Sequence, residues 1–172
     1  GPSNLVTSKD LKVKKIVSAK EMMNEVKKSL PVDIAVCAAA VSDFKPIIMN
    51  KNKIKKNTSN IESIRLEQTP DILDYLSKNN ETRPKIVIGF SAETENLIQN
   101  SKNKIKEKYC DLIIANDVTK EEYGFNSEYN KVSIIDKKGN VKSLPKNKKS
   151  FIANAIAKII LDKLLKHDKN IN

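Results

Sequence analysis

The sequence contains few of the residues that build disulfide frameworks, metal centres and aromatic surfaces. Its 172 residues include two cysteines, Cys37 and Cys110, one histidine, His167, and no tryptophan. Two cysteines do not make a disulfide framework, and the same counts exclude a zinc site built from histidine and cysteine. A cysteine nucleophile is also disfavoured, because its histidine partner would have to come from the C-terminal tail. A hard cation held by carboxylates and phosphate oxygens stays compatible with this composition.

Long hydrophobic runs are missing as well. No run of about 18 apolar residues is present, so no segment is expected to span a bilayer. No charged and then apolar signal segment opens the chain. With 39% hydrophobic and 31% charged residues, we expect a cytoplasmic globular protein that has no membrane partner.

The chain is strongly basic, with a formal net charge of +11. This charge fits either a solvated lysine-rich surface or a site for an anion, such as a nucleic acid or a nucleotide. Aromatic residues make up only 5% of the sequence and do not interleave with the basic runs, which argues against a surface on which bases stack. A small phosphorylated ligand therefore explains the charge better than a nucleic acid partner does.

Apolar runs and amphipathic segments alternate along the chain, which is typical of α/β proteins. Strands are predicted at 11–17, 32–40, 85–90, 111–115, 131–136 and 141–144, and helices at 18–30, 70–77, 94–108 and 149–166. The nearly continuous apolar run 32–40 indicates a central strand buried on both faces. Ser18 and Glu21 form a capping-box pattern that begins the first helix. The expected fold is a parallel three-layer α/β domain.

No linker or internal repeat divides the sequence, so one domain over 1–172 is expected. Residues 50–68 are polar and basic and then alternate in polarity, which predicts an extended arm projecting from the sheet. After the arm, Thr69 is expected to cap a helix whose first residue is Pro70, with Asp71 at its positive end.

Polar and acidic residues follow several of the predicted strands. Ligands of parallel sheets bind beyond the carboxyl ends of the strands, and these ends carry Ala38–Asp43, Gly89–Glu93 and Asn116–Asp117. The four glycines form no G-x-G-x-x-G pattern, which argues against a dinucleotide-dependent dehydrogenase.

Five short motifs, in this order and at these separations, resemble the synthetase domain of the bacterial phosphopantothenoylcysteine synthetase family. They read AAAVSDF at 38–44, KIKK at 53–56, QTPDIL at 68–73, GFSAET at 89–94 and ANDV at 115–118. The resemblance implies a Rossmann-like parallel sheet with an extended β arm that builds a homodimer. It also implies a frequent fusion to a flavin-dependent decarboxylase.

The resemblance implies a reaction in two steps. The carboxylate of 4′-phosphopantothenate attacks the α-phosphate of CTP, and the amine of L-cysteine then displaces CMP from the acyl-cytidylate. Mg²⁺ accompanies the triphosphate, and Asp43 is the residue expected to contact the cytosine or the cation. The expected function is therefore CTP-dependent ligation in coenzyme A biosynthesis.

The resemblance also assigns the remaining site residues. Lys53 and Lys56 of the arm are the expected catalytic residues, since a cation near the triphosphate stabilises the charge that develops on pyrophosphate. The nucleotide is expected to contact Cys37, Ala38, Ala39, Asp43, Lys53, Pro70, Asp71, Ile72, Leu73, Phe90, Lys104 and Lys108. Lys104 and Lys108 lie four residues apart and share one face of a helix. Asn116 and Asp117 are expected near the substrate.

One departure from the family pattern concerns the beginning of the chain. Family members open with a glycine-rich strand and turn, and the sequence from Gly1 resembles the part that follows the second strand. We expect roughly one βαβ portion of the domain to be missing here. The alternative to an active ligase is a non-catalytic module that binds nucleic acid or serves dimerisation.

Overall fold

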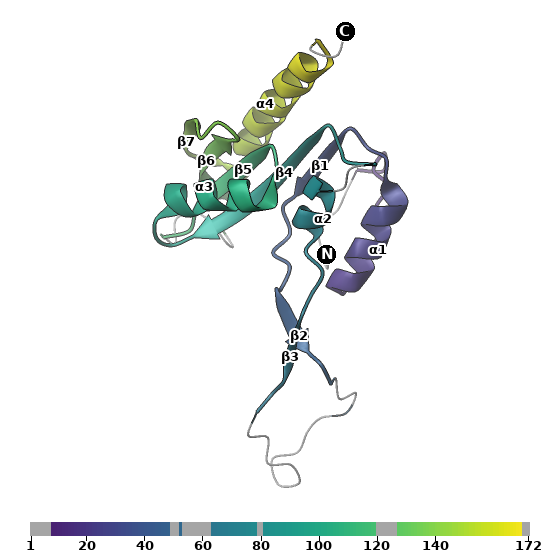
Figure 1. Cartoon of the computed structure of the whole chain (residues 1–172). Helices are drawn as coiled ribbons and strands as arrows, with labels where there is room; N and C mark the ends of the chain where they lie inside the picture. The colour runs from purple at the N-terminus through teal and green to yellow at the C-terminus, as the bar shows by residue number, and fades with distance from the viewer. Residues whose placement is uncertain (1–7, 49–51, 53–62, 79–80, 120–126, 170–172) are drawn as a thin grey trace. The chain divides into compact units, whose positions relative to one another are not determined.

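The computed structural model describes residues 8–48, 52, 63–78, 81–119 and 127–169. The chain forms two compact units (Figure 1). Residues 1–28 and 40–71 make up the first, here called the arm unit, and residues 29–39 and 72–172 make up the second, the sheet unit. No helix within the described ranges is both long enough and apolar enough to cross a membrane.

A five-stranded mixed sheet organises the sheet unit, with the strand order β1-β4-β5-β6-β7. The strands β1 (Ile34–Cys37), β4 (Ile86–Glu93) and β5 (Leu112–Asp117) run parallel. The hairpin of β6 (Tyr129–Asp136) and β7 (Val141–Lys148) joins β5 in the antiparallel sense. The helices of this unit are α2 (Ile72–Lys78), α3 (Leu97–Lys108) and α4 (Lys149–Lys169).

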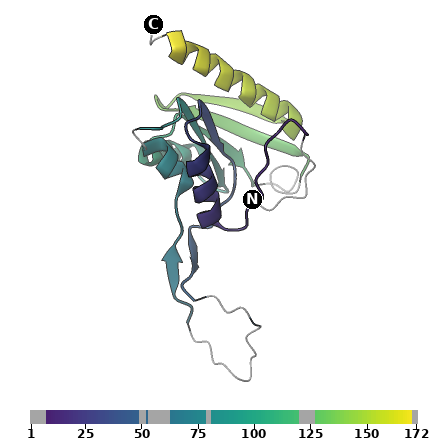
Figure 2. The same ribbon diagram turned by 90° about the vertical axis from the view of Figure 1, so that its right-hand side faces the viewer.

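Helices cover both faces of this sheet because its central strands β4 and β5 are apolar and buried on both sides. Alternate strand residues share a face, and Ile88, Ile114 and Ile134 form one core cluster with the buried isoleucines of α4. Figure 2 shows α4 lying along this side of the sheet. On the other face, Ser91 of β4 meets Ser101 of α3 through a buried hydroxyl pair at 2.8 Å. The predicted three-layer α/β arrangement is confirmed within the sheet unit.

Gly89 allows α2 to lie close against β4. A Cβ atom at this position would lie 2.6 Å from Cδ2 of Leu73 and 2.8 Å from Cδ1 of Ile113. Both distances are shorter than van der Waals contact allows, so a larger residue would displace one of these side chains. The glycine of the GFSAET motif therefore has a packing role.

The two edges of the sheet differ in composition. The β7 edge bears Pro145 together with Lys142, Lys146 and Lys148, whereas β1 consists of Ile, Ala, Val and Cys. The prediction that 32–40 forms a central strand is wrong, because β1 is an edge strand and Val36 is 51% exposed. An apolar run does not reveal whether a strand has one neighbour or two.

Helix α1 spans Ala19–Ser29, and all of it except Ser29 belongs to the arm unit. The arm unit also contains a two-stranded ribbon. The predicted capping box is confirmed, since the Glu21 amide donates to Ser18 Oγ and the Ser18 amide donates to Glu21 Oε2, each at 3.2 Å. In the ribbon, β2 (Phe44–Pro46) pairs with β3 (Leu66–Gln68) in the antiparallel sense. These strands lie at the base of the predicted arm, whose residues 49–51 and 53–62 fall outside the described residues.

Two local predictions for the arm unit are wrong. Residues 11–17 form no strand, because their alternating pattern has no hydrogen-bonded neighbouring strand in the described chain. The Thr69 hydroxyl donates to the carbonyl of Ser42 instead of capping a helix, and α2 begins only at Ile72. Pro70 and Asp71 therefore precede the helix.

Candidate functional site

The carboxyl edge of the sheet is stepped, because β1 ends before β4 and β5. The last residue of β1, Cys37, pairs with Gly89, whereas β4 continues to Glu93 beside Asp117 of β5. Cys37 is half-buried, and the following Ala38 and Ala39 are exposed. The side chains that follow β1 at this step are small and exposed, which suits the close approach of a ligand.

Phe90 and Lys104 come together at this edge. The Phe90 side chain packs against the core cluster on the α4 face, and its backbone carbonyl accepts a hydrogen bond of 3.0 Å from Lys104 Nζ. The half-buried Lys104 thus ties α3 to the end of β4 and holds a positive charge there. A fixed ammonium at a strand end can bind an anionic ligand.

Asn116 and Asp117 end β5 next to the last residues of β4. Asn116 pairs with Ala92 and Asp117 with Glu93 in the parallel register. Asn130 Nδ2 donates to Asn116 Oδ1 at 3.1 Å, and Lys131 Nζ lies 3.2 Å from Asp117 Oδ2. Both expected substrate residues are therefore held by β6.

The Asp117 carboxylate is kept ionised by its neighbours. Partial burial raises its pKa, but the bonds donated by the Thr119 hydroxyl and amide and by Lys131 outweigh burial and lower it. The hydroxyl bond is 2.6 Å long and the amide bond 3.2 Å. Asp117 is therefore an acceptor at neutral pH rather than a proton donor. Glu93 lies beside it and accepts a bond of 3.2 Å from Asn100 Nδ2.

Lys108 has a different environment from Lys104. Its Nζ lies 3.9 Å from Oδ1 of Asp74 in α2, and Asp74 also pairs with Lys78 at 2.6 Å. Lys108 ends α3, one turn beyond Lys104 and close to the amino end of β5. The structure thus gives the two lysines separate partners, and only Lys104 contacts the end of β4.

In the arm unit, the structure joins two of the motifs. The Thr69 amide donates to the carbonyl of Asp43 at 2.9 Å, so Asp43 lies beside the segment that leads into Pro70 and Asp71. The Asp43 side chain is exposed. Ile72 and Leu73 belong to the sheet unit, where Ile72 is buried and Leu73 packs near Gly89. Lys53 and Lys56 lie outside the described residues.

Sequence reasoning missed Asn130 and Lys131. Asparagine is uncommon inside strands, so Asn130 within β6 was a signal for a role other than packing. Its partner could not be named from the sequence, because only the antiparallel pairing of β5 with β6 brings Asn130 to Asn116.

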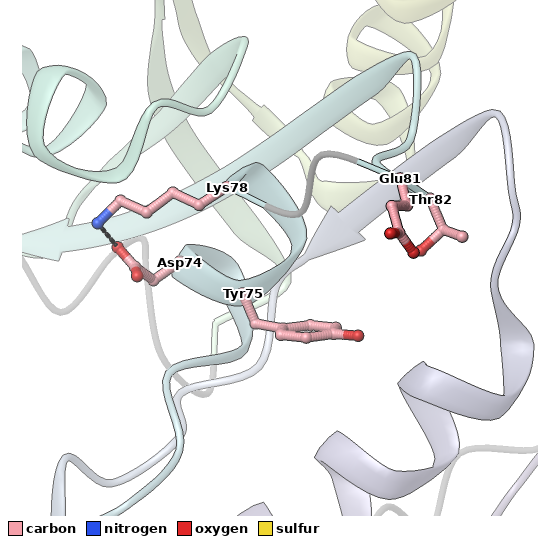
Figure 3. Close-up of a pocket in the computed structure, with 5 residues that line it drawn as sticks. All are labelled: Asp74, Tyr75, Lys78, Glu81 and Thr82. Atoms are coloured by element: carbon pink, nitrogen blue, oxygen red, sulfur yellow. Dashed lines mark ion pairs between the residues drawn. The ribbon is translucent and has the colours of Figure 1, made fainter.

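A pocket lies at the opposite end of the sheet unit, between the end of α2 and the segment that leads into β4. It has a volume of about 420 Å³ and is lined by Asp74, Tyr75, Lys78, Glu81 and Thr82 (Figure 3). Lys78 and Asp74 neutralise each other there. None of the expected site residues lines this pocket, so we place the candidate site at the carboxyl edge of the strands.

No group of three or more histidine, cysteine, aspartate or glutamate residues could hold a metal ion in the part of the chain that the structure describes. Mg²⁺ needs no such cage, because it commonly uses one or two carboxylates together with substrate phosphates. The exposed carboxylate of Asp43 fits that requirement in its chemistry.

Known proteins are similar to this chain in sequence and in fold. A family model described as "DNA/pantothenate metabolism flavoprotein C-terminal domain" matches residues 1–164. The chain belongs to this family. The resemblance inferred from the five motifs is thereby confirmed, and the family domain accounts for nearly all of the sequence.

Relatives of the family domain are longer proteins. The coenzyme A biosynthesis bifunctional protein CoaBC of Borreliella burgdorferi is 43% identical over 162 residues, which cover 93% of this chain and 40% of that protein. CoaBC of Vibrio vulnificus strain CMCP6 is 35% identical, with the same coverage. The chain thus spans less than half the length of these curated relatives.

Solved structures share the fold. The crystal structure of the C-terminal domain of CoaBC matches with a TM-score of 0.76 and 29% identity, over 96% of this chain and 72% of that one. A Cab2 mutant in complex with phosphopantothenate-cysteine matches with a TM-score of 0.54 and 21% identity, over 77% of this chain and 45% of that one. The α/β fold expected from the sequence is confirmed by these likenesses.

Proposed function

We propose that this chain carries the phosphopantothenate–cysteine ligase activity of coenzyme A biosynthesis and that it uses CTP. The observation that carries the proposal is the carboxyl side of β4 and β5, where Lys104 of α3 donates to the Phe90 carbonyl and Asn116 lies near the end of β5, in a domain of this family. The names of the CoaBC relatives and the ligand of the Cab2 complex support the same reaction.

The proposed reaction activates a carboxylate and then forms an amide. The 4′-phosphopantothenate carboxylate attacks the α-phosphate of CTP, forming an acyl-cytidylate and releasing pyrophosphate. The L-cysteine amine then attacks the acyl carbon, so the new C–N bond replaces the bond to CMP. The amine proton leaves to solvent or a nearby base.

Each proposed contact matches a chemical group of the protein to a part of the nucleotide. The half-buried Cys37 and the small, exposed Ala38 and Ala39 suit a close ligand approach, and the Lys104 ammonium suits a phosphate. Asp43 would contact the cytosine or hold Mg²⁺, which would neutralise phosphate charge. The further proposed contacts are Lys53, Lys56, Pro70, Asp71, Ile72, Leu73, Phe90 and Lys108 for the nucleotide, and Asn116 and Asp117 for the acid.

The assembly is proposed on the same basis. We propose a homodimer formed through the arm, cytoplasmic location, and association or fusion with a flavin-dependent decarboxylase; the family description names a flavoprotein, and the CoaBC relatives are named bifunctional. The uncharged edge of β1 is compatible with an additional strand beside it.

Calorimetric titration with CTP, ATP and GTP in the presence of Mg²⁺ tests the nucleotide. We expect CTP to bind best, and we expect CMP release that depends on both 4′-phosphopantothenate and cysteine. Binding of polynucleotides with a steep loss of affinity in salt, together with no CTP binding, would instead support the non-catalytic alternative.

Lys104 offers a residue-level test with a matched control. Lys104→Ala removes the ammonium at the end of β4, so we expect CTP affinity to fall about tenfold or more. Lys106→Ala removes an exposed lysine of the same helix and should leave the affinity unchanged. Equal affinities in the two variants, with intact folding by circular dichroism, would contradict the role of Lys104.

A further inference from the structure

Asn130 is the one residue of β6 whose side-chain amide bonds to the candidate site. Its Nδ2 donates to Asn116 Oδ1 across the antiparallel β5–β6 pair, at 3.1 Å. Asn116 is only partly buried and is the next-to-last residue of β5, beside Ala92. The orientation of the Asn116 amide decides whether the site offers a hydrogen-bond donor or an acceptor to a ligand.

The orientation of Asn130 is itself fixed by the backbone. The Lys131 amide donates to Asn130 Oδ1 at 2.9 Å. A backbone N–H can only donate, so the atom that it meets must be the oxygen of the Asn130 amide. The other atom of that amide is then the nitrogen, and it can only donate to Asn116.

The same logic continues to Asn116. Because its oxygen accepts from Asn130, the NH₂ group of Asn116 is the end that remains for other partners. An NH₂ group suits an acceptor oxygen, such as that of a carboxylate, phosphate or amide carbonyl. The neighbouring Asp117 does not compete for this role, since it is an acceptor already engaged by Thr119 and Lys131.

We propose that Asn130 is a positioning residue, which holds the Asn116 amide so that its NH₂ group donates to an oxygen of the acid substrate. The proposal rests on the ligase function proposed above. It adds that Asn116 is the donor in this contact and that Asn130 fixes the orientation of the Asn116 amide. Asn130 itself touches only protein atoms, and it acts through Asn116.

Two substitutions at Asn130 separate positioning from a merely structural role. In Asn130→Asp, one carboxylate oxygen can still accept from the Lys131 amide, but the other can no longer donate to Asn116. The Asn116 amide must rotate to donate to that carboxylate, and it then presents its oxygen to the substrate. In Asn130→Ala, Asn116 has no partner on this side and can adopt either orientation.

Titration of the full chain with 4′-phosphopantothenate, without CTP so that no acyl-cytidylate forms, measures the effect. We expect Asn130→Asp to weaken binding of the acid by on the order of 10- to 100-fold, because a donor is replaced by an acceptor facing an acceptor. Asn130→Ala should lose only about threefold, since the amide can rotate back. A structural role predicts the reverse order, because aspartate keeps the shape of asparagine and alanine does not.

Added salt distinguishes charge repulsion by the new carboxylate from the effect of an inverted Asn116 amide. Repulsion between exposed charges is screened at high ionic strength, whereas an inverted amide is not. The defect of Asn130→Asp should therefore persist in about 0.5 M salt, where the Debye length is only a few ångströms. A defect that disappears in salt would overturn the positioning role.

A spectroscopic measurement tests the amide without substrate. The side-chain ¹H–¹⁵N resonances of Asn116 should shift in Asn130→Asp, because its NH₂ group gains a carboxylate partner. Unshifted resonances, or equal binding by the wild-type protein and Asn130→Asp, would overturn the inference and leave the ligase proposal standing. Failure of the wild-type protein to bind the acid would instead overturn the ligase proposal, and the resonances would still decide the orientation.

Discussion

At the scale of single residues, Asp111 shows how the sheet unit holds a buried charge. Only 8% of this residue is exposed, at the start of β5, where its carboxylate meets the Val87 amide, Arg83 and Lys137, each at 2.8 Å. Burial raises the pKa of Asp111, but the bonds from Lys137, Val87 and Arg83 outweigh burial and lower it. The charge is therefore stabilised in the folded protein relative to the unfolded chain.

Asp111→Asn keeps the shape of the side chain and removes its charge. Because the folded pKa is depressed, the stabilisation is present above the unfolded pKa of about 3.9 and is lost as pH falls through the folded pKa. We expect the variant to be less stable by about 2 kcal/mol at neutral pH. This difference should shrink as the pH falls below about 4.

Urea unfolding of both proteins at a series of pH values measures this difference. Asp162→Asn, at an exposed position of α4, is the matched control and should follow the wild-type curve. A gap between wild type and Asp111→Asn that stays constant or widens toward acid pH would contradict the assignment.

Residue patterns predicted part of the candidate site. The position of Asn116 and Asp117 at the carboxyl end of a buried strand was readable from the apolar run before them, although the predicted strand stopped at 115 and β5 includes both residues. Which of their side-chain atoms remain to donate or accept hydrogen bonds was not readable, because this depends on Asn130 and Lys131 from another strand. The separate partners of Lys104 and Lys108 were also hidden, since helix spacing gives a face but not the strand or helix that the face meets.

At the scale of elements, most helices and strands were predictable from periodicity, and their neighbours were not. The capping box located the start of α1, and the apolar runs located β4 and β5. The edge position of β1 and the late start of α2 depend on tertiary partners, such as the Ser42 carbonyl that takes the Thr69 hydroxyl.

The ribbon of the arm unit has two unlike faces. Alternation places Phe44, Pro46 and Leu66 on one face together with Gln68, and Lys45 and Glu67 form an ion pair of 2.9 Å on the other. Phe44 is 53% and Leu66 is 55% exposed. A two-stranded ribbon is marginally stable alone, so an exposed apolar face favours the proposed contact with a second copy.

Leu66→Lys places a charge on the apolar face, where two such ribbons would meet in a homodimer. We expect this variant to be monomeric, because a lysine buried between two apolar faces has no partner. Lys45→Ser changes the charged face and should remain dimeric. Sedimentation equilibrium of the wild-type protein and both variants measures this. A monomeric wild type, or a dimer that survives Leu66→Lys, would contradict the proposal.

At the scale of the whole molecule, the two units differ in how much core they contain. Among the described residues, Met23 is the one buried hydrophobic residue of the arm unit, and the others all belong to the sheet unit. Residues such as Val87, Ile88, Ile113 and Ile135 are fully buried. Stability in proteins follows such differences in buried apolar contact.

Amide hydrogen exchange should be slower in the sheet unit than in the arm unit. We expect amides of β4 and β5 to exchange on the order of 1000-fold more slowly than those of β2 and β3, because the former open only with the sheet. Mass spectrometry of peptides from the exchanging protein measures both rates. Similar protection in the ribbon and the sheet would show that the arm unit is stabilised by contacts other than its own core. Added CTP should slow exchange in the segments that bind it.

The unlike edges of the sheet limit how copies of the protein can join. A fibre that grows strand by strand needs both edges of every sheet, one to receive the previous copy and one to offer to the next. On β7, the proline lacks an amide proton and the lysines repel a second strand, whereas β1 carries neither obstacle. Growth through the sheet therefore stops after one added strand, and a crowded solution of this protein is guarded against open-ended polymerisation.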